Sequence, residues 1–489
     1  MLHYSKTFIA LLLACVSCNV PAQENPKYDK ETEAKIKQVE NNLRGWVHIE
    51  DSVNTWNLQQ RMAHYKIPGL SIAVVHNGKI EWARAYGMMD TATQKPVSVQ
   101  TLFQAASISK SLNGVGVLKL AQDKKVDLYT DINTYLHTWK FPYDSVSKGK
   151  KITIANLLSH TAGLTIHGFP GYKRSDTLPS LPQILDGKRP ANTEPVRSQF
   201  APGLRSEYSG GGITISQMIV MDFTHEPYDT YMWNNVLKPL DMTMSSYTQP
   251  PAKDKEKFLA TGYRQDGKEV EEKFHVYPEQ AAAGLWTNPT DLAKYIIETQ
   301  LSLQGKSHKV LTQEMTQLRL TPYLDSFAAL GVFIEKKGTE KYFQHGGSNE
   351  GFRCQYYGSF ENGKGVVVMV NSDEGRILNE VINSVASVYG WKDFYKQVVK
   401  KVVNIPDSLI KAYEGNYFLN KDTINISKKG NEVLLIINRS EIFNIYFSSA
   451  DEFFSKEIPL EFKFEKDKDG KVQDFYFKQG EQELRAKRL

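Results

Sequence analysis

A serine and a lysine three residues apart, Ser107 and Lys110, form the pair whose residue types and spacing most directly suggest chemistry. Residues three apart share one face of a helix, so this hydroxyl and this amine can meet. A serine hydroxyl is a weak nucleophile until a neighbouring base takes its proton, and an amine in a partly desolvated pocket can help to do so. The pair therefore predicts an acylated nucleophile at Ser107, and the structural alternative is a helix N-cap.

The same spacing occurs at three other places, which are Ser145/Lys148, Ser147/Lys150 and Ser408/Lys411. The first two pairs lie in a polar loop, and the third follows a proline and an aspartate as a helix N-cap does. Ser107 alone is followed by apolar residues at helical spacing, namely Leu112, Val115, Leu118 and Leu120. A buried helix from Ser107 to about Gln122 is therefore expected to carry the pair.

The size and charge of the chain exclude some classes of function. Its 489 residues are too many for one small core, so two domains, or one large domain with an appendage, are expected. The apolar fraction of 41% and the charged fraction of 24% are typical of a globular protein. The formal charge is only +5 and no basic tract dominates the sequence, so nucleic acid is not expected as a partner.

The first 22 residues are typical of a secretory signal peptide. Lys6 precedes an apolar run over residues 8–16, which is too short to span a bilayer, and Val20-Pro21-Ala22 offers a cleavage site. Lipoprotein processing at Cys15 or Cys18 is the alternative. Cleavage after Ala22 would leave Cys354 as the single cysteine, which excludes an internal disulfide and a thiolate metal site. The mature protein is therefore expected in the periplasm or medium, with no transmembrane segment.

The order of predicted elements indicates an α/β (α+β) fold between residues 46 and 400. Residues 23–45 are polar and predict a linker. Two strands over 70–75 and 79–86 flank Asn77-Gly78, a strong type I′ hairpin signal. A mostly helical interval then extends to about residue 301, and strands return over 329–335, 342–345, 351–358 and 365–371, followed by a helix over 377–389. We expect one antiparallel sheet flanked by helices, with a helical subdomain over it.

The composition changes after Pro406, and residues 405–489 predict a second domain. Short apolar runs over 423–426, 433–437, 442–447, 460–464 and 472–477 are separated by turn signals that contain glycine. Regularly spaced short strands of this kind predict a small antiparallel barrel or sandwich.

Two other segments carry groups that could assist a reactive serine. Tyr208-Ser209-Gly210 places a phenol beside a glycine run, and near a lysine such a hydroxyl could ionise and act as a base. His345-Gly346-Gly347-Ser348 places an imidazole where glycines let the backbone approach a ligand closely. Taken singly, the first segment is more simply explained as a core or rim tyrosine before a flexible turn, and the second as a hairpin turn with a histidine at its edge.

Together, Ser107-x-x-Lys110, Tyr208-x-Gly210 and His345-x-Gly347 resemble the three motifs of the serine β-lactamase and penicillin-binding-protein-like superfamily. The resemblance is greatest to the class C-like branch, which includes class C β-lactamases, D-aminopeptidases, D-Ala-D-Ala carboxypeptidases and family-VIII esterases. Further stretches that resemble this branch lie at residues 157–164, 236–242 and 282–289. The C-terminal segment is similar to the lipocalin-like barrel that follows this domain in some peptidases, where it could wall the cleft or be a structural appendage.

The resemblance implies a role for each motif residue. Ser107 would be the nucleophile, Lys110 the group that lowers its pKa, and Tyr208 the general base. His345 stands where the third motif usually has lysine, and Gly210 stands where the second motif often has asparagine. The backbone N–H groups of Ser107 and Ser348 would form an oxyanion hole, and Gly210 and Gly347 would line the substrate site. Both departures resemble peptidases and esterases more than efficient β-lactamases.

The sequence therefore predicts an exported serine hydrolase that cleaves a small amide or ester, such as a peptide containing a D-amino acid. The alternatives are a binding or sensor protein with this fold and little turnover, and a weak β-lactamase. No cofactor or metal is implied, because the sequence lacks an H-E-x-x-H motif. It also lacks a G-x-S-x-G elbow, since residues 346–350 miss the last glycine.

Overall fold

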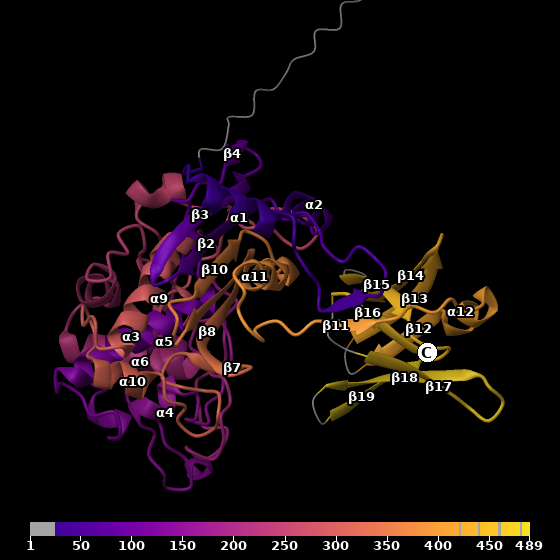
Figure 1. Ribbon diagram of the computed structural model, residues 1–489. Helices are drawn as coiled ribbons and strands as arrows, with labels where there is room; N and C mark the ends of the chain where they lie inside the picture. Colours follow the sequence, from indigo (N-terminus) through magenta and orange to yellow (C-terminus); the bar gives the residue numbers. More distant parts are fainter. Residues whose placement is uncertain (1–24, 420–421, 439–440, 458–460, 480–481) are drawn as a thin grey trace, which may run out of the picture.

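The computed structural model describes residues 25–419, 422–438, 441–457, 461–479 and 482–489. The expected signal peptide lies outside these residues. The described chain forms a larger part, in which helices surround a sheet, and a smaller C-terminal barrel beside it (Figure 1). None of the described helices is long and apolar enough to cross a bilayer.

The larger part is built on an antiparallel sheet with the strand order β4-β3-β2-β10-β9-β8-β7. These strands are β2 (Gly69–His76), β3 (Lys79–Asp90), β4 (Lys95–Pro96), β7 (Phe333–Lys337), β8 (Glu340–Asn349), β9 (Phe352–Ser359) and β10 (Gly365–Val370). Asn77 and Gly78 both have positive φ and join β2 to β3, as a type I′ turn requires. Val74 of β2 pairs with Val366 of β10, so the sheet combines both ends of the segment as predicted.

Alternate residues of the central strands enter different cores. Val366 and Val368 of β10 pack in one apolar cluster, whereas Val367 and Met369 pack in another, because successive side chains of a strand point to opposite faces. Three helices cover the first face, namely α1 (Lys30–Glu40), α2 (Leu58–His64) and α11 (Arg376–Val388). Helix α9 (Pro289–Leu303) packs on the second face, against β2 and β10.

The expected linker over residues 23–45 is wrong for its central part. Residues 30–40 form α1, and its Ile36 and Val39 are buried against α11. The sequence did not predict this helix, because most of its residues are polar and its apolar residues form only one narrow stripe. Helix α1 is therefore part of the larger domain.

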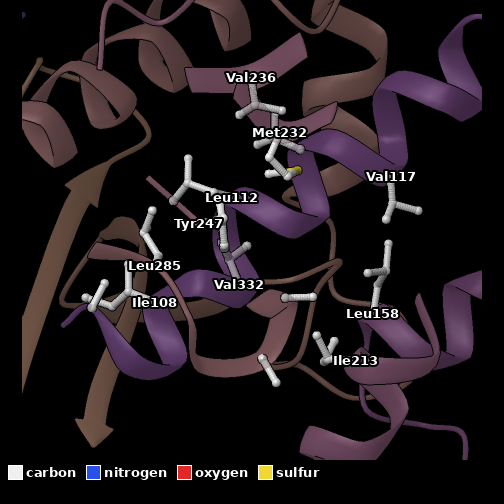
Figure 2. Packing of buried hydrophobic residues seen from close by; sticks show 14 of the residues in the cluster. Ile108, Leu112, Val117, Leu158, Ile213, Met232, Val236, Tyr247, Leu285 and Val332 are labelled. Carbon is white, nitrogen blue, oxygen red and sulfur yellow. The ribbon is translucent and has the colours of Figure 1, made fainter. Parts of the chain in front are cut away.

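The helical region over the second face surrounds α3 (Ser109–Gln122) on every side. Its other helices are α4 (Ile154–Leu158), α5 (Leu181–Asp186), α6 (Gly210–Thr224), α7 (Tyr228–Met232), α8 (Gln280–Ala283) and α10 (Gln313–Arg319). Leu112 and Val117 of α3 lie among side chains from α4, α6 and α7 (Figure 2). Even Asn113 is buried, where it donates to Ser216 at 2.9 Å and accepts from Tyr228 at 2.9 Å. A helix buried all round is held rigidly, which suits a scaffold for a reactive group.

The C-terminal part is a closed barrel of eight strands. They are β12 (Gly415–Leu419), β13 (Asp422–Lys429), β14 (Glu432–Ile437), β15 (Glu441–Phe447), β16 (Glu452–Ser455), β17 (Glu461–Lys466), β18 (Val472–Gln479) and β19 (Gln482–Arg488), preceded by α12 (Asp407–Tyr413). Five apolar runs predicted strands here, and β12, β16 and β19 complete the closure. Phe453, Phe464 and Phe475 fill the interior.

The barrel is joined to the α11 side of the sheet. Strand β1 (Val47–Ile49) pairs in parallel with β11 (Val398–Lys400), beside the barrel. The N–H of Trp46 donates to the carbonyl of Lys456 at 2.8 Å, and Arg376 at the start of α11 donates to the carbonyl of Ile442 at 3.4 Å. These contacts lie on the face opposite α3, which favours a structural appendage over a wall of the cleft around Ser107.

Candidate active site

A sharp turn ahead of α3 presents Ser107. Ser107 lies in a 3-10 turn, η1 (Ala106–Ile108), and the α-helix itself begins two residues later at Ser109. Ala106 has a φ of 48°, a region that L-residues other than glycine and asparagine rarely occupy. The turn is held by a hydrogen bond of 2.8 Å from the N–H of Ala105 to the carbonyl of Leu285. Local strain of this kind is common where a side chain must be fixed for reaction.

Lys110 points at Ser107 from the first turn of α3. Its Nζ lies 3.0 Å from the Oγ of Ser107 and donates to the carbonyl of Ala282 in α8 at 2.6 Å. The side chain is buried, and burial lowers the pKa of Lys110 to about 7 because the charged amine is desolvated. Near neutral pH a large fraction of this amine is therefore uncharged and able to accept a proton.

Tyr208 reaches the same oxygen from the turn ahead of α6. Its hydroxyl donates to the Oγ of Ser107 at 2.8 Å. Burial raises the pKa of Tyr208 well above its usual range, and the hydrogen bond to Ser107 only partly opposes this shift. The phenol is therefore protonated in the free protein. The glycine run after it begins α6 rather than a flexible turn, with the Oγ of Ser209 accepting from the N–H of Gly212 at 2.9 Å.

His160 is a residue of this site that the sequence analysis did not single out. Its ring centroid lies 4.4 Å from that of Tyr208, and its Nδ1 accepts from the N–H of Ser209 at 3.2 Å. Burial, and then the nearby Lys110, lower the pKa of His160 well below its usual value. The imidazole is therefore a neutral support for the tyrosine turn. In the sequence, His160 lies within residues 157–164, a stretch that resembles the class C-like branch. That resemblance did not assign a role to any residue of the stretch.

His345 lies on β8, and its ring is a neighbour of the Tyr208 ring. The predicted strand ends at His345, but β8 continues through the two glycines to Asn349. The ring centroids of His345 and Tyr208 are 6.3 Å apart. Burial lowers the pKa of His345 to about 3. Its Nδ1 lies 2.6 Å from the carbonyl of Gly346, so Nδ1 carries the proton and Nε2 is an acceptor, which has no partner among the described residues.

Gly347 lets β8 approach the nucleophile turn. A Cβ at this position would lie 2.3 Å from the carbonyl oxygen of Ala105 and 2.4 Å from the Sγ of Cys354. Only glycine therefore fits, and the close packing places the backbone of Ser348 beside η1. Phe333 of β7 pairs with Gln344, and the described ladder between β7 and β8 ends there. Beyond Gln344, the edge of β8 is therefore not paired with the described residues of β7, and this edge lies beside the site.

Gly210 has a structural reason to lack a side chain. A Cβ there would lie 3.0 Å from the ring of Phe169 and 3.3 Å from the carbonyl oxygen of His167. The space that an asparagine side chain would use is therefore bordered by an aromatic ring. This side of the site offers an apolar surface in place of an amide.

These distances bring four of the predicted residues together: Ser107, Lys110, Tyr208 and His345, with Gly347 and Ser348 alongside. An antiparallel sheet, a helical layer and this cluster between them define the class of serine β-lactamases and penicillin-binding proteins. The family model described as Beta-lactamase matches residues 56–386, more than half of the chain. The chain therefore belongs to the beta-lactamase family, as its motifs predicted.

Known relatives agree with this assignment. The chain is 28% identical over 312 residues to protein flp of Staphylococcus aureus (strain N315), covering 62% of this chain and only 60% of flp. It is 24% identical over 326 residues to PbpX of Bacillus subtilis (strain 168), a protein named for the penicillin-binding proteins, covering 65% of this chain and 74% of PbpX.

Solved structures agree on the fold. The octameric penicillin-binding protein homologue from Pyrococcus abyssi superposes with a TM-score of 0.59 at 19% identity, over 88% of this chain and 98% of that chain. SurE, in a crystal structure with D-Leu, superposes with a TM-score of 0.54 at 16% identity, over 94% of this chain and 99% of that chain.

Proposed function

We propose that this protein is an exported serine hydrolase that cleaves a small amide or ester through an acyl-enzyme on Ser107. One observation carries the proposal: Lys110, from α3, and Tyr208, from the turn ahead of α6, both direct hydrogen bonds at the Oγ of Ser107. A structural N-cap serine needs neither partner. A buried amine with a lowered pKa beside a hydroxyl is the arrangement that activates a nucleophile.

The pKa of Lys110 is lowered and that of Tyr208 is raised, and these opposite directions assign different proton transfers to the two residues. The uncharged Lys110 amine takes the proton of Ser107 while Oγ bonds to the substrate carbonyl carbon. The sequence interpretation gave this role to Tyr208, but its raised pKa suits a phenol that passes a proton on to the leaving atom. As the bond to the leaving group breaks, Tyr208 donates its proton to the leaving atom, and the Lys110 ammonium restores the proton of the phenol. In the second half, the uncharged Lys110 amine takes a proton from water while the water oxygen attacks the acyl carbon, and Lys110 returns that proton to Oγ as the bond between Oγ and the acyl carbon breaks.

Backbone N–H groups would hold the oxyanion that forms in each half. The N–H of Ser107 at the turn and that of Ser348 on the adjoining strand are the two donors we assign. Each donor of this kind typically contributes about 3 kcal/mol to the stabilisation of the transition state. The strained turn and the glycine at position 347 are what bring the two segments so close.

The site favours uncharged substrates of modest polarity. His345 is neutral and provides an acceptor where a lysine would provide a cation, and Gly210 leaves no amide to hold an acyl-amide chain. Peptides that contain a D-amino acid remain within this class, and SurE, which shares the fold, was crystallised with D-Leu. Hydrolysis of β-lactams would at most be slow.

Turnover of a chromogenic acyl ester, combined with intact-protein mass spectrometry, tests this proposal. We expect a burst of chromophore followed by steady turnover, and one fluorophosphonate adduct that peptide mapping assigns to Ser107. A parallel incubation with penicillin shows whether a β-lactam acylates the same residue, and the intact mass reports whether residues 1–22 are absent. No turnover and no adduct would make this chain a binding protein instead.

Substitution of Tyr208 by phenylalanine is expected to lower kcat/KM for an alkyl ester by about 10²- to 10³-fold, because a proton donor is lost. The loss should be smaller for a p-nitrophenyl ester, whose leaving group departs without protonation. The ring still packs on His160, so the unfolding midpoint should change little. Tyr129→Phe, at an exposed tyrosine, is the matched control. Equal losses for both esters would remove Tyr208 from the proton-donor role.

A further inference from the structure

Two stacked phenylalanines extend outward from the candidate active site, and we call them the aromatic wall: Phe333 and Phe327. The ring centroid of Phe333 lies 5.0 Å from that of His345 and 6.2 Å from that of Tyr208. Phe327 stacks on the outer side of Phe333, at 4.5 Å between centroids and 15° between ring planes. Aromatic side chains therefore run from the buried site to the surface.

The outer ring of the wall is exposed but held in place. Phe327 is 44% exposed. Its carbonyl accepts from the N–H of Ile334 at 2.8 Å, and the carboxylate of Asp325 accepts from the N–H groups of Phe327 and Ala328, both at 2.7 Å. Tyr323 and Leu324, on the same segment, are also exposed. The exposure of an apolar ring to water is unfavourable, and a ligand that covers the ring removes this cost.

The chemistry of the proposed reaction decides which half of a substrate meets the wall. Tyr208 passes its proton to the leaving atom, so the leaving group must lie on the Tyr208 side of Ser107. Phe333 begins β7 on that side, where it pairs with Gln344.

The groups that surround His345 agree with an apolar occupant. His345 donates through Nδ1 to its own strand and presents only an acceptor nitrogen. The rings of Tyr208 and Phe333 pack against it, and the neutral His160 packs against both of these rings. The Lys110 amine is directed away, at Ser107 and the carbonyl of Ala282.

We propose that the aromatic wall binds the leaving group, and that the substrates are esters or amides whose leaving group carries an uncharged aromatic or bulky apolar substituent. This inference rests on the proposed function and names the substrate class of the same site. It makes Phe327 and Phe333 specificity-determining residues. Because an aromatic contact adds a modest free energy, the expected preference is about tenfold.

The test compares benzyl butyrate with methyl butyrate, which share an acyl group and have leaving alcohols of similar acidity. We expect kcat/KM for the benzyl ester to exceed that for the methyl ester by about tenfold, after division by the hydroxide-catalysed rate of each ester. In Phe327→Ala the ratio should fall to about threefold or less, mainly through KM for the benzyl ester. Phe327→Tyr should keep the ratio.

Phe418→Ala provides a matched control, because this phenylalanine is 43% exposed and lies on β12 of the barrel. Its ratio should equal that of the wild type. If the wild type shows no preference, or if Phe327→Ala leaves the ratio unchanged while both esters turn over, the wall does not bind the leaving group and the proposed function stands. If the wild type turns over neither ester and takes no fluorophosphonate, both proposals are overturned.

Discussion

Substitution of Ser107 by alanine is expected to abolish fluorophosphonate labelling and to reduce ester turnover by about 10⁴-fold or more. Removal of a nucleophile that works as a unit with its base removes the covalent route altogether. The residual rate would come from oxyanion stabilisation and substrate positioning alone. Steady-state turnover of the chromogenic ester and the intact mass after labelling measure the two effects on the same sample.

The chain supplies its own control for this substitution. Ser408 has a lysine at the same spacing, but it is exposed at the start of α12. Ser408→Ala should label and turn over as the wild type does. Labelling that survives in Ser107→Ala, or that moves to another serine, would contradict the assignment of the nucleophile.

Substitution of Lys110 by methionine is expected to lower kcat/KM by about 10³-fold, because the amine that takes the first proton is lost. Methionine keeps most of the apolar stem in place. In the wild type, kcat/KM should rise with pH along a limb with an apparent pKa of about 7, since only the uncharged amine accepts the proton. Below this pH Lys110 is charged and the rate should fall tenfold per pH unit.

His345, His160 and Tyr208 cannot account for such a limb. Burial keeps His345 and His160 uncharged throughout this range, and Tyr208 stays protonated across it. A limb near pH 7 that persists in Lys110→Met would assign the first proton transfer to another group. Lys411→Met, in the exposed pair of α12, is the control that should leave both the rate and the limb unchanged.

Much of the fold follows from local patterns in the sequence. Asn77-Gly78 indicated one hairpin, and the strand patterns of residues 351–358 and 365–371 predicted β9 and β10 nearly to their ends. Helix α1 escaped prediction because its apolar stripe is narrow. The structural alternative for the Tyr208 segment was a flexible turn, yet the glycine run begins α6, where a Cβ at Gly210 would lie 3.0 Å from the Phe169 ring and one at Gly211 would lie 2.8 Å from Val196. Tertiary packing there overrides helix propensity.

The candidate site divides in the same way. The meeting of Ser107 and Lys110 follows from helical spacing, whereas the approach of Tyr208 and His345 required the family resemblance, since nothing local joins such distant segments. His160 and Phe333 were missed because ring contacts and burial arise only in three dimensions. The carbonyl of Ala282 that accepts from Lys110 is a backbone group, and the residue types in the sequence do not predict such a contact.

The way the sheet is assembled also bears on how the protein acquires activity during synthesis. Strands β2 and β3 leave the ribosome early, yet they pair with β10, which is made long after them. Closing so large a loop is entropically costly and slow. The nascent chain therefore cannot bring β8 against η1 until residue 349 has emerged, so a shorter nascent chain lacks the assembled site.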